Sequence, residues 1–557
     1  MFVVLRLDRE DLITVMRVYA SLLLPRTRPG PGKWRNEGHR LGYKQSLHRT
    51  YKFFENFAAS FAALYFIGGI RATFYYGASA AGPAAYWSSY VITCIFAFIT
   101  AAMLAEVCSA LPAAGSIYFW AAESGGPKLG RLFGFIVAWW SSTAWTTFVA
   151  SNCQGAANYL LSELAVFGKW TTDTTDIKFR AVQWAIAQFF LMCCIASNYL
   201  PPRVYKWIFK IATAIILLDF VLNVIWLPIR VSQTYGFQSA KWVFTETTNS
   251  TGAPMGWSWV LSFFSAAGVI VGFDASGHVA EETKNASVVA ARGLFWSAVA
   301  SGLFGFATVI LFLFCTPNLE VLSSLIAPQP FVLLYAMALG KGGHIFMNII
   351  SISALLFNTS VAIVASSRLV YAIARDGVLP FSGWIAKVSP SGQPRNAVTV
   401  IWVVAALILC SILPSNVAFT SLVSAAALPT IAAYALIAFG RLFLTPKAFR
   451  NAPWSLGILS KPFQVIALVW NLYILGVLSS PLYYPTSAAT LNYAPVIFGG
   501  ITLFAVLCWW FTPAEAWMRQ KPLEEVIELS QEGGHGGHQS AFVAGVRQRR
   551  GSKGSSE

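Results

Sequence analysis

Residues 57–76 read FAASFAALYFIGGIRATFYY, an apolar stretch with Gly68-Gly69 in its middle and the charged Arg71 close behind. Residues 261–280 read LSFFSAAGVIVGFDASGHVA and again combine glycines with a charge, Asp274. At bilayer depth, helix-breaking residues and charges are tolerated only where they are buried in protein or line a cavity. Two such segments in matching positions of two halves are typical of the binding site of a secondary transporter. We therefore predict two broken membrane helices that face one substrate.

The composition indicates an all-α integral membrane protein. Of the 557 residues, 56% are hydrophobic and 11% are charged, whereas soluble proteins are about 25% charged. The chain holds about twelve apolar runs that are long enough to cross a bilayer. None alternates with a period of two, so they predict helices and not the strands of a barrel. The runs lie near residues 57–78, 84–108, 131–163, 180–199, 204–229, 257–280, 292–315, 343–374, 397–413, 416–439, 462–480 and 493–512.

The order of these runs predicts an inverted repeat. Each interrupted segment begins a set of five runs, over residues 57–229 and 257–439, and two extra helices follow at 462–512. The interrupted segments are the first and the sixth run, so they cross the membrane in opposite directions. Residues 330–339 are expected to form a short helix at the surface. The chain thus divides into a cytoplasmic N-terminal tail, a transmembrane transporter domain and a disordered cytoplasmic C-terminal tail, over residues 1–52, 53–513 and 514–557.

The formal net charge of +16 is unevenly distributed. The short loops on one side carry more Lys and Arg than the loops on the other side, which is the positive-inside pattern. It predicts cytoplasmic termini in a multi-pass protein of the plasma membrane, with the vacuolar membrane as the alternative. The bilayer therefore explains the basic charge, and no nucleic-acid partner is expected. Asn249, in an Asn-Ser-Thr motif of an outer loop, is a predicted glycosylation site.

Histidine and cysteine usage argues against an enzyme and against a metal or another cofactor. The eight cysteines all lie in apolar runs and are interpreted as small core residues. Of the six histidines, only His278 and His344 lie near the membrane, and their spacing is not that of metal ligands. His535 and His538 could bind a metal, but the Gly-rich segment around them is typical of a polar tail.

Four short motifs occur in a fixed order along the chain. They read LGYKQSLHR (41–49), AEVCSALP (105–112), GFDA followed by HVAEETKNA (272–286), and SRLVYAIARDGVLP (367–380). Together they resemble the fungal amino acid/choline permeases, which are GABA permease-like members of the amino acid–polyamine–organocation superfamily. This resemblance implies a five-plus-five inverted repeat and transport of amino acids, GABA, choline or polyamines, generally driven by protons. Ile67-Gly68-Gly69 departs from the Gly-Ser/Thr-Gly that is usual in the first span.

The two breaks indicate how a small amine or zwitterion is held. A broken helix leaves N–H groups free at the start of its second half and C=O groups free at the end of its first half. The N–H end favours a carboxylate and the C=O end favours an ammonium. The alternative is that the glycines only permit close helix packing. The predicted carboxylate site consists of Ile67, Gly68, Gly69 and Ile70, and the predicted carbonyl site of Gly268, Val269, Ile270 and Gly272.

Asp274 is the main candidate for coupling. A carboxyl group at this depth needs a partner or a proton. It is expected to carry a proton, to pair with the substrate cation, or to bond a neighbouring helix. Phe273 is the predicted lid over the substrate, with a core position as the alternative. Ser141, Trp145 and Asn358 are expected to line the cavity, or else to form bonds between helices.

Charged residues at the inner ends of the runs are predicted to act as gates or to form salt bridges that tie helices together, with direct substrate contact as the alternative. Glu106 follows the second run, and Glu281 and Glu282 follow the sixth. Lys210, in the fifth run, is expected to extend its ammonium to the cytoplasm. The alternative places that ammonium where sodium sits in related folds, as a proton-linked cation. Salt-bridge partners expected for the gate residues are Arg375 and Lys284.

These features predict a secondary active transporter that imports amino acids or related amines by alternating access. The proton gradient is the expected driving force, no cofactor is needed, and the partners are a small-molecule substrate and the lipid bilayer. One alternative is a carrier of choline or polyamines. Another is a nutrient sensor that binds its ligand without transport. The sequence makes no prediction of the oligomeric state.

Overall fold

The computed structural model describes residues 49–513 and 517, apart from 170–172, 318–320, 322–324, 326, 415, 450–451 and 488–489. Most of the predicted tails, with His535 and His538, lies outside these residues. In the described part of the chain the elements are helices, and the one isolated β-bridge joins Tyr51 to Thr283. The prediction of an all-α protein is confirmed.

Eleven helices of the described residues are long and apolar enough to cross a membrane, and the shorter α9 belongs to a further span. The first five spans are α2 (Phe53–Leu64) with α3 (Phe66–Ala81), α4 (Pro83–Ala110), α5 (Ser116–Phe167), α6 (Ile177–Asn198) and α7 (Pro202–Gln233). The next five are α9 (Met255–Val269) with α10 (Ala275–His278), α11 (Ala286–Cys315), α13 (Pro330–Arg375), α15 (Arg395–Leu409) and α16 (Asn416–Phe439). The two extra spans are α17 (Ser460–Ser479) and α18 (Ala494–Phe511).

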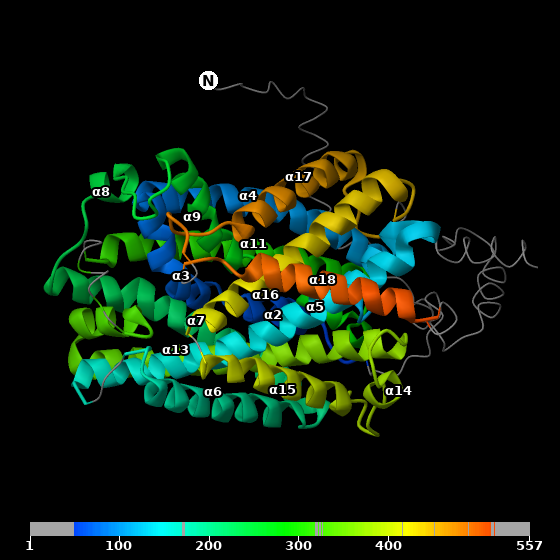
Figure 1. The fold of residues 1–557 in the computed structure, drawn as a ribbon, viewed down its shortest axis with the longest axis horizontal. Coiled ribbons are helices and arrows are strands. Elements are labelled where there is room, and N and C mark those ends of the chain that lie inside the picture. The colour runs from blue at the N-terminus through cyan, green and yellow to red at the C-terminus, as the bar shows by residue number, and fades with distance from the viewer. Residues whose placement is uncertain are drawn as a thin grey trace, which may run out of the picture.

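The predicted five-plus-five arrangement is present, because the first span of each set is broken and the other four are not broken in this way. The spans run roughly side by side along one direction (Figure 1). Two short helices mark opposite ends of the bundle, α8 (Ala240–Thr245) at one end and α14 (Ser382–Ile385) at the other (Figure 1).

Two of the long helices are bent where a glycine has a positive φ. Gly126 in α5 has φ 64° and Gly340 in α13 has φ 72°. The bend separates residues 330–339 from the rest of α13, as the sequence suggested. One face of this helix is buried through side chains such as Phe331 and Tyr335, while Met337 is 40% exposed. The segment therefore closes over the interior of the bundle.

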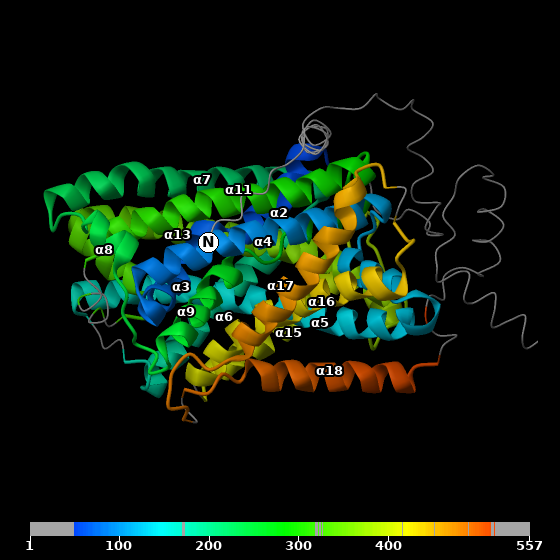
Figure 2. The same cartoon turned by 90° about the horizontal axis from the view of Figure 1, so that it is seen from above.

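The two broken spans lie against each other inside the bundle. α3 packs on α9, while α2 packs on α11 and α7. α5 packs on α13 and α16, so it runs past both breaks. The extra helices α17 and α18 are on the periphery, with α18 along one edge of the bundle (Figure 2). The breaks are thus enclosed by the ten helices of the repeat.

Candidate functional site

The first break consists of a single residue, Tyr65, in the left-handed conformation (φ 37°, ψ 58°) between α2 and α3. The predicted position, Gly68-Gly69, was three residues too late, because both glycines lie in the first turns of α3. A Cβ atom on Gly68 would lie 2.1 Å from Cε1 of Tyr65. The glycine therefore gives space to the ring of the residue that breaks the helix.

Two of the four residues that were predicted to bind a carboxylate lie in the first turn of α3. Ile67 and Gly68 lie in the first turn, where N–H groups have no partner within the helix. Gly69 donates its N–H to the Tyr65 carbonyl at 3.1 Å, and Ile70 lies further inside the helix. Gly69 faces the other break instead, since a Cβ atom there would lie 3.3 Å from Cγ2 of Val269.

Asn358 of α13 binds the carbonyl end of the first break. Its Nδ2 donates to the carbonyl of Ala62 at 2.5 Å and to that of Ala63 at 2.9 Å. Its Oδ1 accepts a hydrogen bond of 2.6 Å from Asn152 of α5. Asn358 is thus at the break and makes the hydrogen bonds between helices that were the alternative to lining the cavity, because its amide satisfies carbonyl groups that α2 cannot satisfy itself.

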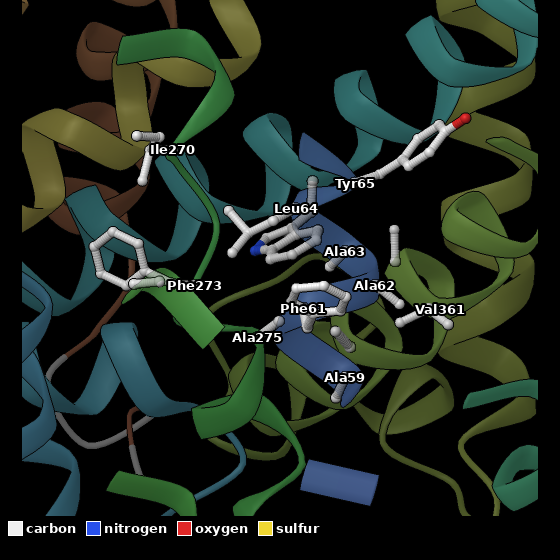
Figure 3. Close-up of a cluster of buried hydrophobic side chains, with 14 of the residues drawn as sticks. Ala59, Phe61, Ala62, Ala63, Leu64, Tyr65, Ile270, Phe273, Ala275 and Val361 are labelled. Carbon is white, nitrogen blue, oxygen red and sulfur yellow. The ribbon is translucent and has the colours of Figure 1, made fainter. Parts of the chain in front are cut away.

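The second break extends from Ile270 to Asp274, between α9 and α10. Gly272 has φ 102°, which favours glycine, and a Cβ atom there would lie 3.8 Å from Cη2 of Trp145. Gly268 and Val269 still belong to α9. Figure 3 shows Leu64 beside the first break opposite Ile270 and Phe273 of the second, with the Tyr65 ring pointing away from them.

Phe273 is a core residue in this conformation. It is 1% exposed, and its ring stacks on Tyr434 of α16 with centroids 5.0 Å apart. A lid would have to leave this stack, so the core alternative describes the observed position.

Asp274 is buried with two titratable neighbours. Tyr434 donates its phenol proton to Oδ1 at 2.5 Å, and Nε2 of His278 lies 3.0 Å from Oδ2. Nδ1 of His278 is 2.6 Å from Oγ of Ser116, at the start of α5. The ring of Trp145 meets that of His278 edge-on, with centroids 5.6 Å apart. The second break therefore carries a buried carboxyl group with an imidazole and a phenol beside it.

The first break carries a different network, which is built around an ion pair that was not predicted from the sequence. Arg71 and Asp219 of α7 are 2.5 Å apart, with side chains 0% exposed. Tyr65 donates its hydroxyl proton to Asp219 at 2.9 Å and accepts from Arg71 at 2.7 Å. Tyr335 accepts from Arg71 at 3.1 Å and donates to Asn223 at 2.7 Å. Two opposite charges in separate apolar runs were the signal that could have identified this pair.

Ion pairs join the helix ends on the side of the bundle that carries α14. Glu281 lies 3.3 Å from Arg375, in agreement with the predicted pairing, and Glu282 lies 2.7 Å from Arg368. Tyr51 lies beside Glu282 at this end of the bundle. Its burial, and to a lesser extent the negative charge of Glu282, raises the pKa of its phenol well above the usual value. Both glutamates follow α10 directly, so these bonds hold the second broken span to the end of α13.

Glu106 has a tying role at the end of α4. Its carboxylate lies 2.8 Å from Arg441, which follows α16, and accepts 2.5 Å and 3.0 Å hydrogen bonds from Ser460 and from the Leu456 N–H. Glu106 thus holds the start of α17 against the repeat. It does not contact either break directly.

Three other predicted residues lie away from the breaks or use their polar atoms locally. Ser141 donates to the Val137 carbonyl of its own helix at 2.6 Å. Lys210 is exposed on α7, with its ammonium 5.2 Å from the Trp207 ring centroid. Its position agrees with a side chain that reaches away from the core and not with an ion in the site. Asn249 is exposed and therefore accessible for glycosylation, which stays a prediction.

Comparison with known proteins places this architecture in a family. The family model described as amino acid permease matches residues 51–502. The thiamine transporter thi9 of Schizosaccharomyces pombe (strain 972 / ATCC 24843) is 52% identical over 508 residues, which cover 86% of each chain. The amino-acid permease BAT1 of Arabidopsis thaliana is 27% identical over 85% of this chain and 93% of that one.

A solved structure shares the fold. The manganese transporter of Eremococcus coleocola superposes with a TM-score of 0.52 over 90% of this chain and 97% of that chain, at 14% sequence identity. At this identity the likeness concerns the fold alone. With the family match over most of its length, this chain is a multi-pass membrane permease, not an enzyme, and it belongs to the amino acid permease family.

Proposed function

We propose that this permease imports a small organic cation and that its substrate is thiamine. The proposal is supported first by the 52% identity to a thiamine transporter over 86% of both chains. The amino-acid permease BAT1 of Arabidopsis thaliana is more distant, at 27% identity. The substrate class predicted from the sequence, amino acids or related amines, thereby changes to an aromatic cation.

The chemistry around the second break supports a cationic substrate. Thiamine carries a permanent positive charge on a flat thiazolium ring. Trp145 borders Gly272, and an aromatic face stabilises a cation by about 0.5–2 kcal/mol. Asp274 supplies a buried carboxylate whose partners are the phenol of Tyr434 and the imidazole of His278, whereas Asp219 is paired with the permanent charge of Arg71. A cation that enters between the breaks therefore meets Trp145 and Asp274.

We propose further that import is coupled to protons through Asp274 and His278. Asp274 lies at the second break beside His278, and histidine is the residue type best suited to exchange a proton in the physiological pH range. A proton on this pair would change the bonds that hold the second broken span, and alternating access follows when the two repeats move against each other. In this proposal both termini are cytoplasmic and the protein resides in the plasma membrane.

A second candidate substrate is an amino acid or a simple amine such as choline. The amino acid is favoured by the two N–H groups of Ile67 and Gly68 at the start of α3, which suit a carboxylate, a group that choline lacks. The same site would also suit a sensor that binds without transport.

The decisive experiment is uptake of labelled thiamine by cells that lack their own thiamine carrier. We expect accumulation that depends on an acidic exterior and that a protonophore abolishes. Unlabelled thiamine should compete, while neutral amino acids, GABA, choline and putrescine should not. Competition by an amino acid alone would favour the second candidate, and saturable binding without uptake would favour a sensor.

A further inference from the structure

A buried histidine lies where the long helix α13 is bent. His344 follows Gly340, the residue with φ 72° that separates residues 330–339 from the rest of α13. We call residues 330–339 the lid helix, because their buried face covers the interior and Tyr335 accepts a hydrogen bond of 3.1 Å from Arg71. From His344 the helix continues toward α14, so the bend is at the opposite end of the bundle (Figure 1). This is the outer end when the termini are cytoplasmic, as proposed above.

His344 joins the bend to α5 through both nitrogens of its ring. Nδ1 lies 3.1 Å from the carbonyl oxygen of Gly340. Nε2 lies 2.7 Å from Oε2 of Glu163, which is about one turn before the end of α5. Asn348 donates a hydrogen bond to the other carboxylate oxygen, Oε1, and so orients Glu163 toward the imidazole. The bend of α13 is therefore tied to the last turns of α5.

The same turns of α5 hold the start of the lid helix. Ser162, next to Glu163, accepts a hydrogen bond of 2.9 Å from the N–H of Gln329, the residue before α13. Beyond the bend, a Cβ atom on Gly343 would lie only 2.8 Å from Cβ of Leu339, so the two parts of α13 pack closely. A change in the bonds of His344 is therefore passed to the lid helix.

The two bonds of His344 need one proton more than a neutral imidazole and a carboxylate provide. A carbonyl oxygen only accepts, so the bond to Gly340 requires a proton on Nδ1. A neutral ring then has a bare Nε2, and a carboxylate also only accepts. Their contact at 2.7 Å therefore needs a second proton, on Nε2 or on Oε2 of Glu163. Without this proton, either the bond to Gly340 or the bond to Glu163 is lost.

Glu163 gives this proton access from water. Its side chain is 18% exposed, whereas that of His344 is 0% exposed. We propose that Glu163 and His344 bind a proton from the external solution and that this proton holds the lid helix to α5. A hydronium ion gives its proton to the pair and leaves as water, and the pair loses its negative charge. The proton returns to the same side, so this site is separate from the coupling proposed for Asp274.

Among the described residues, the ion pair of Glu163 is with His344 alone. The other charged or titratable groups of the elements packed here are the exposed Lys341 and Lys169, Tyr159 of α5 under the guanidinium of Arg71, Arg71 of α3 itself paired with Asp219, Arg230 of α7 bonded to Gln233, and Arg180 of α6 bonded to the Leu413 carbonyl. External pH is therefore expected to act on the bend through Glu163 and His344.

The test is hydrogen–deuterium exchange of the lid helix in the full chain in nanodiscs, at about pH 5 and about pH 8, the limits of the range in which histidines change their charge. Protection factors divide out the direct effect of pH on amide exchange and report local opening. In wild type we expect the protection of residues 330–344 to fall by about tenfold at the higher pH, the effect of one lost hydrogen bond. No substrate is added, so the result does not depend on the substrate proposed above.

Two variants separate a bound proton from a fixed contact. In Glu163→Gln the amide N–H can donate to Nε2 of His344 while Oε1 still accepts from Asn348, so we expect high protection at both pH values. In His344→Phe the ring is kept without its nitrogens, so we expect low protection at both. Glu246→Gln changes an exposed glutamate after α8, at the same end of the bundle, and as the matched control should keep the wild-type response.

Three results would overturn the proposal. Protection that does not change with pH in wild type would show that no proton holds the lid helix, whether or not the variants fold. A pH effect that persists in Glu163→Gln would place the titrating group elsewhere. Low protection of Glu163→Gln at both pH values would show that the pair is a fixed ion pair and not a site for an exchangeable proton.

Discussion

The two broken spans are held by different chemistry. At the first break one left-handed residue, Tyr65, bonds to the buried pair of Arg71 and Asp219. At the second break five residues leave the helix, and Asp274 lies beside His278. Arginine is protonated at every physiological pH, whereas histidine changes its charge between about pH 5 and 8. The first break therefore has a permanent clamp, the ion pair of Arg71 and Asp219, whereas the second break sets a carboxyl group beside a histidine, and we propose that this group exchanges the proton.

The largest expected effect comes from removing one partner of the permanent clamp. Arg71→Met leaves Asp219 as a buried charge without its counter-ion. Breaking a buried pair in this way costs about 3–5 kcal/mol. We expect little folded protein, measured by size-exclusion chromatography and by thermal unfolding in detergent.

The double variant Arg71→Met with Asp219→Asn is the control for this prediction. It removes both charges, and replacement of a whole buried pair is often neutral. Recovery of folded protein would show that the charge, not the packing of Arg71, is what matters. An unstable double variant together with a stable Arg71→Met variant would contradict the clamp.

A smaller effect is expected from a methyl group at Gly68. Gly68→Ala places Cβ 2.1 Å from the Tyr65 ring, and overpacking of this kind costs about 1–3 kcal/mol. The displaced ring would also lose its bonds to the ion pair. We expect a lower unfolding temperature and slower thiamine uptake.

Gly268→Ala is the matched control on the other broken span. A Cβ atom there meets nothing within 4 Å, so we expect a change in stability within about 0.5–1 kcal/mol, in the stabilising direction of a helix interior. If Gly68→Ala and Gly268→Ala lowered the stability equally, contact with the Tyr65 ring would not explain the effect of Gly68→Ala.

The smallest effect on stability is expected where the two breaks meet. Gly69→Ala brings Cβ to 3.3 Å from Val269, and the helix gains about 0.5–1 kcal/mol from alanine. We expect stability close to wild type but slower uptake, because the breaks must move past each other during alternating access. Wild-type uptake rates in liposomes would show that this contact stays intact through the transport cycle.

The architecture was predictable because spans, breaks and orientation of the repeats depend on hydrophobic length and on helix-breaking residues. The position of the first break was not, since Tyr65 adopts a conformation that is unusual for its residue type and depends on tertiary contacts. Arg71 and Asp219 were visible in the sequence as two opposite charges in apolar runs, but their contact was not, because they are 148 residues apart and meet only in the folded bundle. Asp274 was identifiable as a deep charge, but its partner Tyr434 was not.

The central claim is that the second break carries the coupling proton and the first does not. Thiamine-driven proton entry into liposomes, followed with a trapped pH dye, tests it most directly. Wild type should admit protons together with thiamine. Asp274→Asn keeps the size of the side chain but removes the carboxylate charge and the exchangeable proton, so it should still exchange labelled thiamine at saturating concentration, with lower affinity and without proton entry. Proton entry in Asp274→Asn at the wild-type ratio to thiamine would contradict the claim.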